Sequence, residues 1–66
     1  MTIYCNQDVS SEILEKGDWV VHSDEEMVKV GITAGCNTIY LGKKTKSVRP
    51  SLFAPTVEDA LSFISA

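Results

Sequence analysis

The feature that most restricts the fold is an apolar stripe near the end of the chain, since a short helix with one apolar face needs a surface to cover it. Four apolar residues recur at the spacing i, i+3, i+4 and i+7: Val57, Ala60, Leu61 and Ile64. Thr56 precedes them as a good N-cap, and Asp59 completes a variant of the capping box. A helix of about nine residues does not persist alone in water. The stripe therefore has to pack on the rest of the chain.

The size of the chain allows one small domain, which we take as residues 1–66. With 44% hydrophobic and 23% charged residues, the composition is typical of a chain that folds. No apolar run approaches the roughly 18 residues of a membrane span, and the first residues lack the pattern of a signal peptide. We expect a cytoplasmic protein without a membrane partner, whose two cysteines stay reduced.

Several segments have the composition of β-strands. Residues 2–5, 18–22 and 38–41 are rich in β-branched and aromatic residues. Residues 28–33 alternate apolar and other side chains with period two, which predicts a third strand. Residues 23–26 match a capping box but precede this alternation, so we interpret them as an acidic turn. Residues 47–49 are predicted as a fourth, edge strand that ends at Pro50.

The expected fold class is α+β. We predict a small antiparallel three- to four-stranded meander covered by the C-terminal helix, with a short helix after the first strand, capped by Asp8 and ended by Gly17. Cys5 and Trp19 are expected in the core. Cys36 lies in a turn-like sequence and is expected to be the more reactive thiol.

Charge is sorted along the chain, and this sorting defines the candidate binding residues. Residues 1–28 hold seven acids and one base, whereas residues 29–49 hold five bases and no acid. A dipolar surface of this kind steers partners. The candidate partner-binding residues combine bases with one aromatic ring: Tyr40, Lys43, Lys44, Lys46 and Arg49. A secondary acidic patch consists of Asp24, Glu25 and Glu26. For both groups the alternative interpretation is a solvated edge or turn.

No pattern in the chain indicates catalysis, a metal or a cofactor. His22 is the only histidine, and neither Cys5 nor Cys36 lies in a nucleophile signature or a C-x₂-C metal-binding pair. The four glycines match no phosphate-binding loop. We therefore expect a protein that is not an enzyme and has no cofactor and no metal site.

The function predicted by elimination is a small acidic binding module that acts by steric occlusion of a larger protein, for example a nucleic-acid-binding complex. Inhibitors made by phages and other mobile elements, including anti-CRISPR and other anti-defence proteins, are modules of this kind. The main alternative is a nucleic-acid-binding accessory protein that uses the basic turn 43–49. A second alternative is an oligomer that sequesters a small ligand. Marginal burial and the predicted open edge at residues 47–49 also favour a homodimer.

Overall fold

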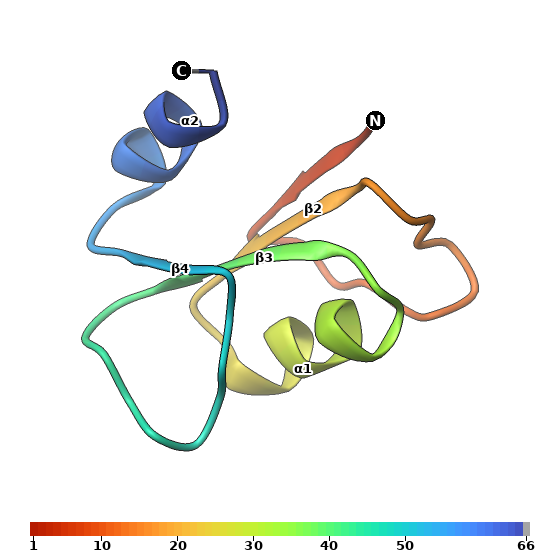
Figure 1. The fold of residues 1–66 in the computed structure, drawn as a ribbon, viewed down its shortest axis with the longest axis horizontal. Helices are drawn as coiled ribbons and strands as arrows, with labels where there is room; N and C mark the ends of the chain where they lie inside the picture. The colour runs from red at the N-terminus through yellow and green to blue at the C-terminus, as the bar shows by residue number, and fades with distance from the viewer. Residues whose placement is uncertain (66) are drawn as a thin grey trace.

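The computed structural model describes residues 1–65 and shows a parallel sheet with a helix on each face (Figure 1). The sheet contains β1 (Ile3–Cys5), β2 (Trp19–His22), β3 (Asn37–Leu41) and β4 (Leu52–Ala54), in the order β1-β2-β3-β4. The helices are α1 (Glu25–Thr33) and α2 (Val57–Ser65). The predicted mixture of helix and sheet is confirmed. The predicted antiparallel meander is wrong, because all three strand pairs are parallel.

The error begins at α1, which was predicted as an acidic turn followed by a strand. Asp24 instead caps the helix, since its side chain accepts a hydrogen bond from the backbone N–H of Glu26 at 2.9 Å. Val28 and Gly31, three residues apart, form the buried face. Packing against the sheet outweighs the weak helix propensity of the valines and the glycine. A helix between β2 and β3 returns the chain to the end where β2 began, so the two strands run parallel.

Gly31 marks the closest approach of α1 to the sheet. A Cβ atom at this position would lie 2.9 Å from the Cγ2 atoms of both Thr38 and Val20. This distance is shorter than van der Waals contact allows. Both of these side chains are almost completely buried. The glycine therefore allows the helix to lie directly on β2 and β3.

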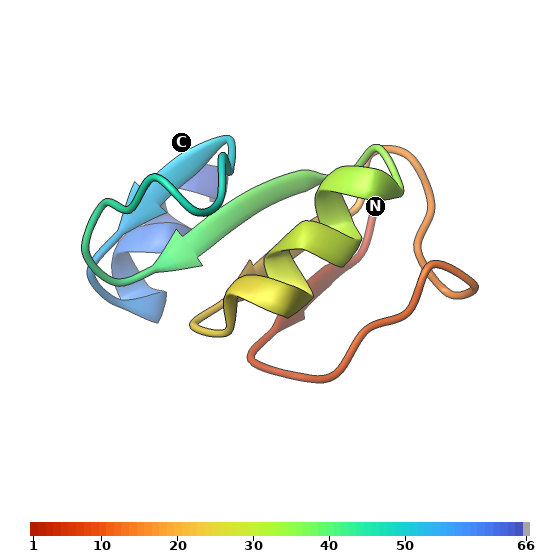
Figure 2. The same ribbon diagram turned by 90° about the horizontal axis from the view of Figure 1, so that it is seen from below.

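Three connections cover one face of the sheet, which we call the α1 face. Seen from below, α1 lies between the loop of residues 6–18 and the loop of residues 42–51 (Figure 2). Val9 and Leu14 of the first loop pack with Val20, and Val48 of the second is 4% exposed. This arrangement follows from strand order. Each strand is added beside the previous one, always on the same side. When all the crossover connections between such parallel strands have the same handedness, they all lie on one face of the sheet.

Two further predictions about the connections are wrong. Residues 6–18 form turns rather than a helix capped by Asp8, although Gly17 does occupy a turn with a positive φ of 92°. The predicted edge strand at residues 47–49 is part of a loop, and the fourth strand begins at Leu52. The Val48 side chain is buried, although its residue belongs to this loop and not to a strand.

The helix α2 covers the opposite face, which we call the α2 face. Its predicted N-cap is confirmed, because Thr56 Oγ1 accepts a hydrogen bond from the backbone N–H of Asp59 at 3.2 Å. Ala60 is completely buried, and Ile64 packs against the core. Leu61, by contrast, is 39% exposed, so the predicted stripe is only partly buried.

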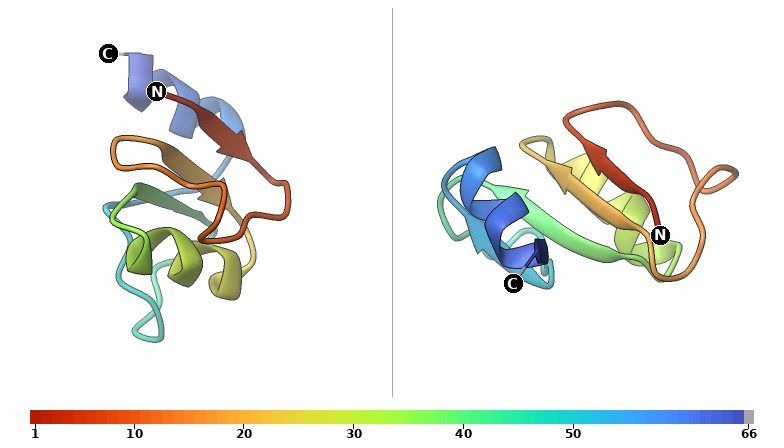
Figure 3. Two further views of the ribbon diagram at one scale, coloured as in Figure 1. Left: turned by 90° about the vertical axis from the view of Figure 1, so that its right-hand side faces the viewer. Right: turned by 90° about the horizontal axis from the view of Figure 1, so that it is seen from above.

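Each face of the sheet has its own apolar cluster. On the α1 face, Val20 packs with Val9 and Leu14. On the α2 face, Val21 and Ile39 pack with Ala60, while Ile3, Cys5 and Trp19 are only partly buried. Viewed from above, α2 lies over β3 and β4 and away from β1 (Figure 3, right). The α2 face is therefore least covered along β1 and at Trp19 of β2.

Candidate functional site: a basic pocket beside β4

The loop of residues 42–51 connects β3 to β4 and carries most of the predicted binding residues. Its second half is held against β3 by two hydrogen bonds between Thr38 and Ser51: the N–H of Ser51 donates to Thr38 Oγ1 at 3.1 Å, and the N–H of Thr38 donates to Ser51 Oγ at 3.2 Å. The Ser47 hydroxyl donates to Glu25 Oε2 at 2.6 Å and so ties the loop to the start of α1. Together with buried Val48, these contacts attach the loop to β3 and α1.

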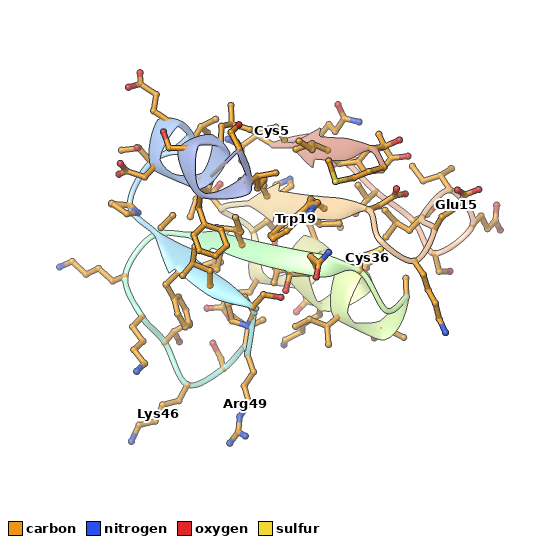
Figure 4. The ribbon with its side chains drawn as sticks, turned by 45° about the horizontal axis from the view of Figure 1, so that its top comes forward. Cys5, Glu15, Trp19, Cys36, Lys46 and Arg49 are labelled. Carbon is orange, nitrogen blue, oxygen red and sulfur yellow. The ribbon has the colours of Figure 1, made fainter. Side chains whose placement is uncertain are left out.

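A pocket of about 390 Å³ lies between this loop and β4. Its lining combines three cations with apolar and hydroxyl groups: Lys44, Thr45, Lys46, Val48, Arg49, Pro50 and Phe53. We call it the basic pocket. Figure 4 shows the side chains of Lys46 and Arg49 extending from the loop, away from the sheet. Both residues are exposed, whereas Phe53 and Pro50 are half-buried and supply the apolar wall.

The cations of the basic pocket form no ion pair within 4.0 Å with a carboxylate of residues 1–65. Within residues 1–65, the one ion pair closer than 4.0 Å joins Lys29 to Glu26, at 3.6 Å and on the surface of α1. Glu25, the acid that contacts the loop, accepts a hydrogen bond from Ser47 rather than from a base. The positive electrostatic potential of the three cations therefore attracts an anionic group of another molecule to the pocket.

The structure brings together three of the five predicted partner-binding residues, namely Lys44, Lys46 and Arg49. Tyr40 does not line the pocket itself, but its ring contacts the lining residue Phe53 edge to face, with the ring centroids 5.9 Å apart. Lys43 is exposed and does not line the pocket. These placements show which residues are neighbours; the binding role itself stays a prediction.

Four lining residues are absent from the predicted set, namely Thr45, Val48, Pro50 and Phe53, and Phe53 is the one that reaches the pocket from another element. The fourth strand was predicted at residues 47–49, whereas Phe53 lies within β4, in register with Tyr40 of β3. Its neighbours Leu52 and Ala54 pack against the cluster on the α2 face, so Phe53 points to the α1 face. The signal that could have revealed this strand is the run of three apolar residues 52–54, between Ser51 and Pro55.

The secondary acidic patch has local structural partners. Asp24 caps α1, Glu25 accepts the Ser47 hydrogen bond and Glu26 pairs with Lys29. Acids in the first turn also suit the positive end of the helix dipole. The part of the chain that the structure describes holds no group of three or more His, Cys, Asp or Glu residues positioned to bind a metal ion.

The remaining candidate groups for chemistry are occupied by backbone hydrogen bonds or by packing. His22 Nδ1 accepts a hydrogen bond from the backbone N–H of Asp24 at 2.9 Å. The Cys36 thiol donates to the carbonyl oxygen of Glu15 at 3.3 Å. Burial, assisted by the negative charge of Asp18, raises the pKa of Cys36 and so disfavours the thiolate. Cys36 is half-buried like Cys5, so the expected difference in reactivity between the two thiols stays a prediction.

A second pocket, of about 440 Å³, lies between the loop of residues 6–18 and α1. Its charged residues are Glu26 and Lys29, which pair with each other. It is larger than the basic pocket but has no unbalanced charge to select a ligand. We therefore place the candidate site at the basic pocket rather than at the larger one.

The sheet has no crevice of the kind that binds ligands in many parallel sheets. Such crevices form at the carboxyl ends of strands where the strand order reverses, whereas here it follows the chain order throughout. No helix among residues 1–65 is long and apolar enough to cross a membrane. Comparisons with protein-family models, with curated proteins and with solved structures found no match to this chain.

Proposed function

We propose that this protein is a non-catalytic binding module that docks on a larger protein through the basic pocket. The observation that carries the proposal is the group of unpaired cations, Lys44, Lys46 and Arg49, around an apolar wall in an otherwise acidic chain. The fitting ligand is an acidic segment of the partner that also presents an apolar side chain. Its carboxylates meet the cations while its apolar group contacts Pro50 and Phe53.

The types of residue in the pocket suit this ligand. Arginine presents a planar fork of donors that matches a carboxylate, and the two lysines add less directional attraction. Because the chain carries a net charge of −3, its other surfaces repel an acidic partner. The charge distribution therefore favours approach with the basic pocket in front.

The mechanism that follows is steric occlusion. A domain bound at this pocket covers the acidic segment and prevents other basic ligands, including nucleic-acid-binding surfaces, from using it. A narrower version of this proposal is that the protein is an inhibitor made by a phage or another mobile element, of the anti-CRISPR or other anti-defence type.

The experiment measures binding of a fluorescent peptide of alternating glutamate and leucine by anisotropy. We expect Lys44→Glu with Lys46→Glu to weaken binding at least tenfold and to leave the melting temperature nearly unchanged, since exposed charges contribute little to folding. The matched control reverses two bases outside the pocket, Lys16→Glu with Lys43→Glu, which gives the same net charge. Equal loss of binding in both variants would show that only net charge matters and would overturn the proposal.

Direct binding of nucleic acid is a second candidate function, favoured by one observation. Phe53 lies among cationic side chains. In proteins that bind single-stranded nucleic acid, an aromatic ring stacks on a nucleobase while neighbouring Lys and Arg side chains hold the phosphate backbone. The same anisotropy assay with a mixed-sequence single-stranded DNA distinguishes the two functions. Binding that falls steeply with salt and disappears in Phe53→Leu would replace the protein-docking proposal.

A further inference from the structure

We propose that β1 is a self-association edge, at which a second copy of this chain pairs antiparallel with β1 about a two-fold axis. The proposal is independent of the basic pocket, which lies beside β4 at the opposite edge of the sheet. It rests on the backbone groups of β1, on the contrast between the two edges and on the partly buried apolar side chains of the α2 face beside β1.

The backbone groups of Ile3 and Cys5 point to the open side of β1. Trp19 N–H donates to the carbonyl of Thr2 at 2.9 Å, and Asn6 N–H donates to the carbonyl of Val21 at 2.8 Å. Residues of a strand alternate in the direction of their backbone groups, so Thr2, Tyr4 and Asn6 face β2. The N–H and C=O groups of Ile3 and Cys5 are thus directed outward and available to another strand.

The two edges of the sheet differ in how well they are protected. Residues 50 and 55, on either side of β4, are prolines, and the basic loop precedes the strand. Prolines and lysines are the usual devices against edge pairing. Residues 1–7 contain no proline and no charged side chain. The protein therefore protects one edge and leaves the other competent to pair.

The side chains of β1 adjoin an apolar surface that α2 does not cover. Ile3, Cys5 and Trp19 are half-buried on the α2 face. Phe63 of α2 is 52% exposed and contacts the Trp19 ring edge to face, with centroids 6.3 Å apart. In Figure 4, Cys5 lies on the outermost strand of this face, next to the strand that holds Trp19. When β1 of a second copy pairs with β1, the Ile3 and Cys5 side chains of that copy lie beside these residues.

A second copy fits this edge in one symmetric register. With Tyr4 opposite Tyr4 of the second copy, Ile3 lies opposite Cys5 and forms the hydrogen-bonded pair of an antiparallel ladder. Each outward N–H then meets an outward C=O, and the two sheets form one sheet of twice the width. Two copies of an acidic chain repel each other least where the strand carries no charged side chain, and this condition is met at residues 1–7.

The experiment uses a cysteine on the proposed axis. In a Cys5→Ser, Cys36→Ser background, Tyr4→Cys places two thiols at a non-hydrogen-bonded pair, with about 4.5 Å between Cα atoms, a separation that a disulfide spans. We expect mild oxidation to give a covalent dimer. The control is Ile13→Cys in the same background, since Ile13 is exposed and lies in the loop after β1 rather than in the strand. Equal crosslinking of the two variants would overturn the proposal.

A measurement on the unmodified chain keeps the test independent of these variants. Ultracentrifugation should show the mass rising with concentration from 7.2 kDa towards twice that value. Over the same range, amide hydrogen exchange at Ile3 and Cys5 should slow at least tenfold, while exchange at Phe53 on the other edge stays constant. A monomer at all concentrations up to 1 mM, or a dimer without protection at Ile3 and Cys5, would overturn the proposal.

Discussion

The two faces of the sheet are covered to very different extents. The α1 face is covered by α1 and by two loops whose buried residues, Val9, Leu14 and Val48, act as core side chains. The α2 face is covered by one helix over β3 and β4, and its side chains on β1 stay half-buried. The difference shows that strand order decides coverage. When every strand is added in one direction, the connections gather on one face, and only the final helix remains for the other.

The largest expected effect tests the contact of α2 with the sheet. Ala60→Asp places a carboxylate in a completely buried site without a partner, which costs about 3 kcal/mol or more. A domain of this size has little stability to lose, so we expect unfolding or a large drop in the thermal melt. The neighbouring change Leu61→Asp is the control and should have a small effect, because Leu61 is 39% exposed. Similar losses for both would mean that the whole stripe is buried.

The second prediction tests the closeness of α1 to the sheet. Gly31→Val adds atoms where even a Cβ would lie 2.9 Å from Val20 and Thr38. Overpacking of this kind costs about 1–3 kcal/mol, more than the gain in helix propensity from replacing a glycine. We expect a clear loss of stability in urea titration. The control Thr33→Val, on the exposed side of the same helix, should stay within about 0.5 kcal/mol of the unchanged chain.

The third prediction compares the faces directly with a matched pair of neighbours. Val20 and Val21 are both completely buried, but Val20 faces α1 and Val21 faces α2. Removing two methyl groups should cost about 1–2.5 kcal/mol at either position. We expect Val20→Ala to cost more, since the thinner cover of the α2 face can relax into the cavity. A larger loss for Val21→Ala in urea titration would show that the α2 face is the more rigid of the two.

The smallest expected effect concerns Asp18, just before β2. Backbone N–H groups of Glu15 and Thr2 donate to its carboxylate, both at 3.0 Å, and these hydrogen bonds lower its pKa. The stabilisation is fully present above the pKa of an unfolded aspartate, about 3.9, and is lost as the pH falls through the lower folded value. Asp18→Asn should therefore lower the melting temperature at pH 7, and this difference should shrink towards pH 2. A difference independent of pH would exclude the carboxylate charge as its cause.

The errors of the sequence-based prediction concentrate in residues 23–33. The alternation of Val28, Val30 and Ile32 matches a strand, while Val28 and Gly31 also lie on one face of a helix. Over so short a run the two periods overlap, and the decision depends on the fit of Gly31 against Val20 and Thr38. These contacts join residues far apart in the sequence, so local patterns do not contain them. Reading this segment as a strand turned a parallel sheet into a meander.

The candidate site was predictable in part. Lys44, Lys46 and Arg49 are close in sequence, and their grouping in one pocket follows from that closeness. The aromatic wall did not follow, because Phe53 reaches the pocket only through the pairing of β4 with β3. The lack of an ion pair at these cations also depends on the fold, in which Glu25 accepts a hydrogen bond from Ser47 and Glu26 pairs with Lys29.

The sequence by itself determined the features that rest on neighbouring residues: the strands at residues 3–5, 19–22 and 37–41, the capped helix α2 and the clustering of basic charge. These features come from side-chain preferences, capping and local spacing, which act over a few residues. Only the tertiary structure decided the direction of the strands, the face that each connection covers and the open edge at β1. Those features depend on which distant surfaces exclude water together, and burial of this kind is a property of the assembled sheet rather than of any one segment.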